Sequence, residues 1–273
     1  MFLDRGRIET KTAEQLELMR AAGLVVAGAL AAVRDALQPG VTTRDLDAVA
    51  AEHIRAAGAT SNFLGYYGYP ATICVSVNHE IVHGIPGDAV IKEGDIVSVD
   101  CGAVVEGWHG DAAVTLAVGA VPQELTDLMR VTEESLWRGI AAMRPGGRLS
   151  DIGHAVEQHV RTAGPYGIVE EYVGHGIGTA MHQDPQVPNY GKPGRGPRLT
   201  PGVVLAIEPM VNLGTHQTEL LEDGWTVVTA DGQPSAHFEH TVALTEQGPW
   251  VLTAVDGGAT RLAALRVRTP VSP

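Results

Sequence analysis

The sequence predicts an α+β protein made of two related halves, with antiparallel sheet inside and helices outside. The 273 residues are 44% apolar and 19% charged, which suits a soluble globular chain with a sizeable core. The expected elements follow one order twice: helix, helix and strands in the first half, then the same in the second. We therefore expect one domain over residues 1–273, with halves of roughly 12–118 and 122–250.

Two helices begin the first half. Apolar residues recur at spacings of three and four over residues 12–37, which predicts a helix with one core-facing stripe. A Thr-x-x-Gln capping box stands at its start. A second helix is expected over about residues 44–57, capped by Thr42 or Thr43 and stopped by Gly58.

Strands follow, and the second half repeats the order. Short runs rich in β-branched residues predict strands at 72–77, 96–100 and 112–116, with a hairpin turn near 105–107. Pro122 opens a third helix, and a fourth spans about 151–162. Further strands are expected at 203–208, 226–229 and 238–244, with an Asp231-Gly232 turn before the last.

Two segments of the first half recur in the second. The stretch from Pro39-Gly40 to Gly58 matches the stretch from Pro145-Gly146 to Gly164, 106 positions later. Residues 94–100 match residues 202–208 at an offset of 108, and both of these strands end in a carboxylate. This repeat predicts an internal duplication, with a site between the two halves.

Charge and cysteine content limit the setting. A net charge of −13 argues against broad binding to nucleic acids or anionic membranes, and we expect no sequence-specific nucleic-acid binding. Cys74 and Cys101 are the only cysteines, which fits a reducing compartment. Residues 1–10 lack the apolar core of a signal peptide, and no uninterrupted apolar run reaches the ~18 residues of a membrane helix. We expect a cytoplasmic monomer that spans no membrane.

Four carboxylates and one histidine lie in apolar or glycine-rich surroundings. Asp100 ends an apolar strand, and the hairpin would set it across from Asp111. Glu208 and Glu239 lie on further apolar strands, and His175 is flanked by glycines. Buried like charges repel, so the set predicts a pair of divalent cations with bridging oxygens, the usual arrangement for activating water on a carbonyl or phosphoryl group.

These five residues, in their motifs, resemble the metal ligands of the methionine aminopeptidases, and more narrowly of the bacterial type I enzymes. The motifs are VSVDCG with GWHGD, GHGIG, AIEP and FEHT, and the resemblance covers about Thr12 to Leu252. It implies the pita-bread fold, whose two halves are related by a pseudo-twofold axis, and a single catalytic domain.

The resemblance also implies a role for each ligand. Asp100 would chelate one metal, Asp111 and Glu239 would bridge both, and His175 and Glu208 would complete the other. A hydroxide held between the ions would attack the carbonyl after the N-terminal methionine, with Glu208 as the base for its proton. The two divalent ions would be Co, Mn, Fe, Ni or Zn, whichever the cell supplies.

Two further histidines match the family, and the resemblance also implies the substrates and the place in the cell where the protein acts. His182 would contact the scissile carbonyl oxygen, and His83 would lie near the scissile amide nitrogen. The substrates would be N-terminal methionine peptides and nascent chains with a small second residue, met at the ribosome near the exit tunnel.

A narrow apolar pocket would hold the methionine side chain. In the match it is lined by Tyr66, Tyr69, Cys74 and Trp225, with Phe63 and Met181 adjoining. Phe63 and Met181 replace the cysteine and phenylalanine common in relatives, and Gly102 stands where relatives often carry threonine. Cys74 lies within a strand without a basic neighbour in sequence, so we expect a wall residue and not a nucleophile.

Two other functions fit the same ligand set. A proline dipeptidase or X-Pro aminopeptidase would share all five ligands, but usually carries an extra N-terminal domain. A non-catalytic peptide-binding relative would have the same fold, but such relatives lose ligands. Cleavage of Met-Ala-Ser against Ala-Pro peptides, with metal analysis, separates the three.

Overall fold

A computed structural model of the protein describes residues 8–270. Most of the charged N-terminal segment therefore lies outside the described residues. The described chain is mixed α and β, with helices α1 and α2 before the first strands and α3 and α4 before the later ones.

Helices α1 (Ala13–Ala36) and α2 (Thr43–Ala56) confirm the first two predicted helices. Each begins with a capping box, formed by Thr12 with Gln15 in α1 and by Thr42 with Asp45 in α2. These side chains satisfy backbone N–H groups that have no partner within the helix. Of the two threonines proposed for the second cap, Thr42 is the one used.

A hairpin of two ten-residue strands, β4 (Ile96–Val105) and β5 (Trp108–Ala117), forms the centre of the first half. Its two turn residues, Glu106 and Gly107, have φ values of 50° and 82°, as a two-residue hairpin loop requires. Strands β1 (Thr60–Ser61) and β2 (Ile73–Val77) pair with β4 and complete a four-stranded antiparallel sheet.

The second half contains a five-stranded antiparallel sheet in the order β15-β14-β9-β7-β8. Its strands are β7 (Gly174–Gly176), β8 (Gln183–Val187), β9 (Val204–Ile207), β14 (His240–Thr245) and β15 (Gly248–Val251). Two three-stranded sheets complete the structure: β13-β10-β6 and β11-β12-β3. Their strands are β3 (Glu80–Val82), β6 (Gly167–Ile168), β10 (Met210–Asn212), β11 (Thr218–Leu220), β12 (Val227–Thr229) and β13 (Ser235–His237).

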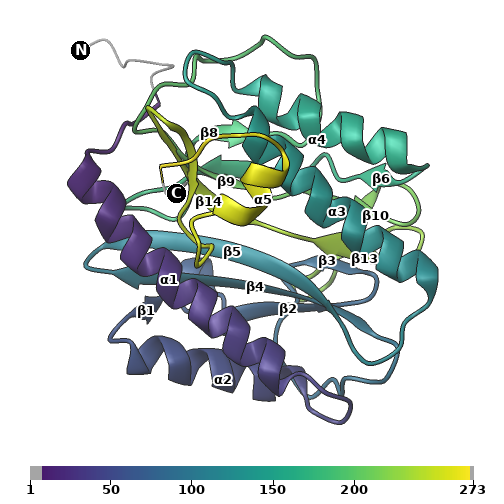
Figure 1. The fold of residues 1–273 in the computed structure, drawn as a ribbon. Coiled ribbons are helices and arrows are strands. Elements are labelled where there is room, and N and C mark those ends of the chain that lie inside the picture. Colours follow the sequence, from purple (N-terminus) through teal and green to yellow (C-terminus); the bar gives the residue numbers. More distant parts are fainter. Residues whose placement is uncertain (1–7, 271–273) are drawn as a thin grey trace.

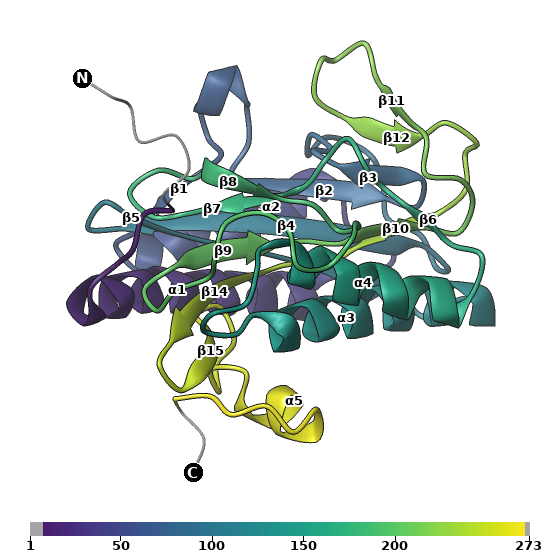
Figure 2. The same ribbon diagram turned by 90° about the horizontal axis from the view of Figure 1, so that it is seen from above.

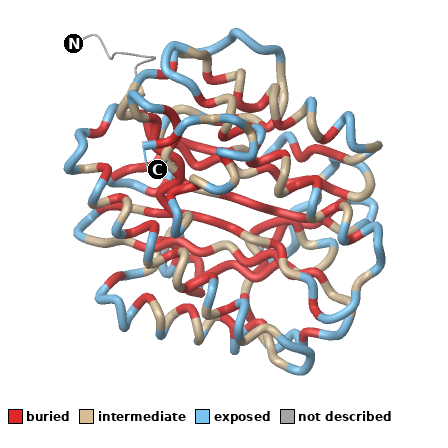
Figure 3. The backbone as a smooth tube through the Cα atoms, in the orientation of Figure 1, coloured by how far each residue is buried: buried red, intermediate tan, exposed pale blue. Residues whose placement is uncertain are grey.

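The helices lie mainly on one side of the strands. Figure 2 shows α1, α3 (Gln123–Ala142) and α4 (Ser150–Ala163) on that side, and α2 packs beside α1 in Figure 1. The β11–β12 hairpin and the short helical turn η1 (Tyr66–Gly68) project from the opposite side (Figure 2). The short helix α5 (Ala259–Ala264) follows the last strand. Buried backbone runs along the central strands between the exposed outer faces of the helices (Figure 3).

Two details of the strands differ from the prediction. The strand expected at 238–244 is β14, which begins two residues later than predicted, at His240; Phe238 and Glu239 lie in the break between it and the preceding strand β13. In the hairpin, Asp111 pairs with Gly102, and Asp100 pairs with Ala113. The prediction that Asp100 lies directly across from Asp111 is therefore wrong by two residues, because the hairpin is centred between Glu106 and Gly107, one residue later than that pairing requires.

Local contacts recur at the predicted offsets. The N–H of Gly40 donates to the carbonyl of Ile91 at 2.9 Å, and the N–H of Gly146 donates to that of Leu199 at 2.8 Å. The carboxylates of Asp45 and Asp151 each accept a backbone N–H three residues earlier, both at 2.8 Å. The internal duplication stays a prediction, and a duplicated chain would show matched contacts of this kind.

Helix α1 requires a correction to the expectation about membranes. Within the described part of the chain, it is the one helix that is long and apolar enough to cross a membrane. The expectation considered only uninterrupted apolar runs, whereas a few charged residues interrupt the apolar ones in α1. In the structure Met19, Val26 and Val33 are fully buried in the core, and α1 packs on β4 and β5. These residues form the core side of α1, while Leu24 is exposed on its other side.

Candidate metal centre and substrate pocket

The predicted ligands converge where the two halves meet. Asp100 and Asp111 are diagonal neighbours on one face of the β4–β5 hairpin, because Asp100 pairs with Ala113 and Asp111 with Gly102. Glu208 directly follows β9, and His175 is the middle residue of β7. Glu239 lies in the break before β14. One cavity is lined by all five side chains.

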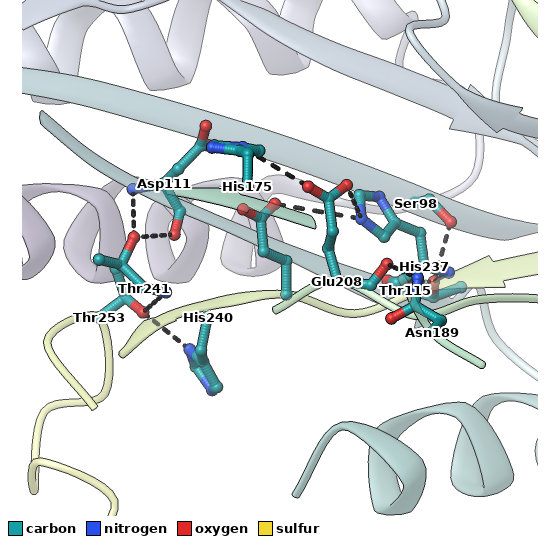
Figure 4. A network of polar contacts seen from close by, with 11 residues as sticks. Ser98, Asp111, Thr115, His175, Asn189, Glu208, His237, His240, Thr241 and Thr253 are labelled. Carbon is teal, nitrogen blue, oxygen red and sulfur yellow. Dashed lines mark hydrogen bonds and ion pairs between the residues drawn. The ribbon is translucent and has the colours of Figure 1, made fainter. Parts of the chain in front are cut away.

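Backbone hydrogen bonds fix the acids at the junction of the two halves. The N–H of Glu239 donates to the carbonyl of Ala113 at 2.9 Å, which joins the break after β13 to β5. The N–H of Asp111 donates to the hydroxyl of Thr241 at 3.0 Å, and that hydroxyl donates to the Asp111 carbonyl at 2.8 Å (Figure 4). Both proposed bridging residues, Asp111 and Glu239, are therefore held where β5 lies against the start of β14.

His175 presents one ring nitrogen to the acids. Its Nδ1 lies 3.0 Å from the Gly176 carbonyl, an acceptor, so Nδ1 carries the proton and Nε2 has the lone pair. That Nε2 lies 3.5 Å from Glu208 Oε1. A lone pair facing an ionised carboxylate oxygen at this range is repulsive, and either a proton on Glu208 or a cation between the two atoms removes the repulsion. The flanking glycines are required here, because a Cβ at Gly174 would overlap the Ala206 carbonyl.

Burial makes this concentration of acids costly without a cation. It raises the pKa of Asp100 to about 7 and that of Glu208 to about 8. Burial and the neighbouring carboxylates raise the pKa of Asp111 and of Glu239 well above the ordinary value. One oxygen each of Asp100, Asp111 and Glu239 is buried without a hydrogen-bond partner among the described residues.

The donor set fits divalent cations. Two overlapping groups, Asp111–His175–Glu239 and Glu208–His237–Glu239, each place one donor atom per residue within 4.8 Å of the others. Asp100 belongs to neither group and Asp111 to one, while His237 was not among the predicted ligands. Cation–oxygen and cation–nitrogen bonds of about 2.0–2.2 Å would satisfy the unpaired oxygens and neutralise the repulsion. Glu239 belongs to both groups, as expected for a residue that bridges two ions.

The raised carboxyl pKa values predict an unusual pH dependence for the metal-free protein. Between about pH 4 and 8 the native state binds more protons than the unfolded chain, so the stabilising contribution of these acids is complete at the acidic end and lost as pH rises. We expect metal-free protein, in chelator, to melt at a lower temperature at about pH 8.5 than at about pH 6, and saturating Mn²⁺ to remove the difference. Calorimetry tests this, and a metal-free melting temperature that does not fall over this range would contradict it.

Both predicted substrate-binding histidines line the same cavity. Nδ1 of His182 lies 2.8 Å from the Tyr66 hydroxyl, and its ring packs against that of His175 with centroids 4.4 Å apart. His83, at a φ of 61°, packs edge-on against Trp225. Burial lowers the pKa of both His83 and His182, so neutral imidazoles face the cavity.

Aromatic residues surround the cavity, which has a volume of about 170 Å³. Tyr69 packs edge-on against Phe63 and Trp225, with ring centroids 6.4 and 5.1 Å away. Its hydroxyl donates to the carbonyls of Ile73 and Gly84, so an apolar ring faces the space. All six predicted pocket residues line this cavity: Phe63, Tyr66, Tyr69, Cys74, Met181 and Trp225.

Cys74 is a buried wall residue, as the sequence predicted. It pairs with Asp100 across β2 and β4. Burial, and then the Asp100 charge, raises its pKa well above the usual thiol value. A thiol that resists ionisation is a poor nucleophile.

Several lining residues were not singled out from the sequence. Val82, Tyr172, Val173 and Met210 also line the cavity, and Tyr172 packs edge-on against His83. His237 joins the acid cluster itself. Its position two residues before Glu239 was the available signal, because alternate residues of an extended segment share a face.

Asn62 explains why position 102 is glycine. A Cβ atom at Gly102 would overlap the Asn62 amide, whose nitrogen donates to the Gly110 carbonyl at 3.2 Å. We expect Gly102→Thr to destabilise the protein by about 1–3 kcal/mol through overpacking. Adding Asn62→Ala should restore part of the loss, which urea unfolding of both variants measures. Equal stability of Gly102→Thr and the parent would show that Asn62 moves freely.

Comparisons with known proteins agree with this site. A model of metallopeptidase family M24 matches residues 17–246. Methionine aminopeptidase 1 of Mycobacterium tuberculosis is 54% identical over 257 residues, 91% of this chain and 97% of that protein. The crystal structure of a methionine aminopeptidase from Thermotoga maritima matches with a TM-score of 0.89 at 47% identity, over 90% of this chain and 99% of that one.

A prolidase from Pyrococcus furiosus matches less well, with a TM-score of 0.71 at 21% identity, over 90% of this chain and 65% of its own. That likeness shows a shared fold. The pita-bread architecture predicted from the sequence, α+β with antiparallel sheets, is confirmed. The chain belongs to metallopeptidase family M24, within the type I methionine aminopeptidases.

Proposed function

We propose that the protein removes the N-terminal methionine from peptides and nascent proteins by metal-dependent hydrolysis. The observation that carries the proposal is one cavity of about 170 Å³ that is lined both by the five candidate ligands and by apolar and aromatic side chains. Such a cavity suits an unbranched, polarisable side chain, and the acids suit the cations that hydrolysis needs. The high identity to methionine aminopeptidases supports the same substrate class.

The cations would be held by Asp100, Asp111, His175, Glu208 and Glu239, with Asp111 and Glu239 shared between two ions. When bound, they supply an activated water and polarise the scissile carbonyl. Glu208, whose pKa is raised by burial, is suited to accept a proton from the attacking water.

The histidines act on the substrate in this proposal. The Tyr66 hydroxyl can donate to Nδ1 of His182, which leaves the proton on Nε2 for the scissile carbonyl oxygen. A donor placed there stabilises the negative charge that develops on that oxygen. His83 lies beside Trp225 and contacts the scissile amide nitrogen, while Phe63, Tyr69 and Trp225 enclose the methionine side chain.

The setting is part of the proposal. The protein works as a monomer in the cytoplasm, on chains that leave the ribosome near its exit tunnel. Two divalent ions take part, and Co, Mn, Fe, Ni and Zn all suit the mixed carboxylate and imidazole donors. A small second residue is preferred.

Peptide cleavage with matched metal analysis tests the proposal. Protein loaded with Co²⁺ or Mn²⁺ at a controlled free concentration should release methionine from Met-Ala-Ser and leave Ala-Pro peptides intact. Preferential cleavage of Ala-Pro would favour the proline peptidases. Stoichiometric metal without cleavage of either peptide would favour a peptide-binding protein.

A further inference from the structure

His237 is a buried histidine beside the acids, and the reaction described above does not use it. Its side chain is 1% exposed, and neither ring nitrogen has a hydrogen-bond partner among the described residues. Nε2 lies 3.7 Å from Glu208 Oε2 and 4.0 Å from Glu239 Oε2. An unsatisfied polar group at such depth costs about 1–3 kcal/mol, so the contact with the acids needs an explanation.

Glu208 lies between two imidazoles that face different oxygens. His175 Nε2 lies 3.5 Å from Oε1, and His237 Nε2 lies 3.7 Å from Oε2 (Figure 4). The two rings differ in the position of the proton. His175 is protonated on Nδ1 because the Gly176 carbonyl accepts there, so its Nε2 is free for a cation.

In His237 the proton belongs on Nε2. A neutral imidazole carries one N–H, and Nδ1 of His237 has no acceptor among residues 8–270. Cation binding requires the two acids to be ionised, and a proton on Nε2 then points to both carboxylates, whereas a lone pair there would be repelled by both. A charged ring would also carry a proton on Nε2, so the assignment holds for either charge state.

The backbone of His237 is fixed firmly enough to hold this orientation. Its N–H donates to the Thr115 hydroxyl at 2.8 Å, and that hydroxyl donates to the His237 carbonyl at 2.9 Å. The Thr115 proton is thereby used, so Ser98 donates its own to Thr115 at 2.8 Å. This chain of contacts anchors β13 to the β4–β5 hairpin.

We propose that His237 is a positioning residue of the metal centre, whose Nε2–H holds Glu208 Oε2 so that Oε1 stays turned toward His175. The distance of 3.7 Å exceeds a hydrogen bond, and a small rotation of the Glu208 side chain closes it. The inference rests on the proposed function, because it assigns to Glu208 the ligand and base roles given there.

Histidine NMR on the intact protein tests the assignment directly. In ¹⁵N-histidine protein loaded with Zn²⁺, His237 should be protonated on Nε2, and His175 on Nδ1 with Nε2 bound to metal. A His237 spectrum with Nε2 bound to metal, or with the proton on Nδ1, would overturn the proposal. This measurement requires no variant and no turnover.

Two substitutions separate the donor from the side-chain volume. His237→Gln keeps an N–H donor, whereas His237→Met has none. We expect His237→Met to lower Co²⁺ affinity or kcat on Met-Ala-Ser by about 10–100-fold, with KM little changed, and His237→Gln to recover most of the loss. Equal loss in both variants, or loss in neither, would overturn the inference.

His240→Gln is the matched control. His240 is also held by a threonine, with Nδ1 2.9 Å from the Thr253 hydroxyl, but it lies away from the acids (Figure 4). We expect its metal affinity and kcat to equal those of the parent. If the parent binds Co²⁺ without cleaving Met-Ala-Ser, the proposed function fails, while the NMR and affinity comparisons still decide the role of His237.

Discussion

Replacing Glu239 with alanine is expected to abolish cleavage of Met-Ala-Ser and to lower the bound metal below that of the parent. Glu239 is 2% exposed, belongs to both candidate ligand groups, and has one buried oxygen without a described partner. A bridging ligand serves two ions, so its loss leaves neither with a full set. Since bound ions contribute several kcal/mol to hydrolysis, the rate should fall by about 10³-fold or more.

Metal analysis and single-turnover kinetics, at one fixed free metal concentration, measure both effects. Glu246→Ala is the matched control, because Glu246 is an exposed acid in the turn after β14. It should keep full activity and metal content. Near-normal turnover by Glu239→Ala would show that the reaction does not depend on a shared pair of ions.

His182→Ala should lower kcat by ~10²-fold while leaving metal content unchanged. His182 belongs to neither candidate ligand group, and in the proposed mechanism it donates to the oxygen that becomes negative in the transition state. The effect should therefore appear in kcat, and metal analysis of the same preparation should match the parent.

Tyr66→Phe tests whether the Tyr66 hydroxyl orients the His182 ring. The Tyr66 hydroxyl lies 2.8 Å from His182 Nδ1, so its removal should lower kcat by less, about 10-fold. An unchanged kcat in His182→Ala would remove His182 from the mechanism, and lost metal in the same variant would make it a ligand instead.

Local patterns in the sequence were sufficient for most of the elements. The stripe over residues 12–37 and the turn at Glu106-Gly107 are set by neighbouring residues, and the structure has both. The motifs around Asp100, His175 and Glu208 pointed to a metal-dependent family, and the comparisons confirm that family.

Features that depend on contacts between residues far apart in the sequence could not be predicted from local patterns. In the break at Phe238-Glu239, the N–H of Glu239 donates to the carbonyl of Ala113 on a strand of the other half, a contact that the local sequence does not reveal. The hairpin register depends on the position of the turn centre, and a centre one residue later than assumed makes Gly102 the partner of Asp111. His237 was identified as part of the site only in the structure, where its Nε2 lies 3.7 Å from Oε2 of Glu208, a residue 29 positions earlier in the sequence.

Anomalous diffraction from crystals of the protein grown with Mn²⁺ or Co²⁺ tests the central claim most directly. We predict two peaks in the cavity, both within bonding distance of Asp111 and Glu239, one also contacting Asp100 and the other His175 and Glu208. Metal found elsewhere on the surface, with these five side chains left unbound at saturating concentration, would contradict the account.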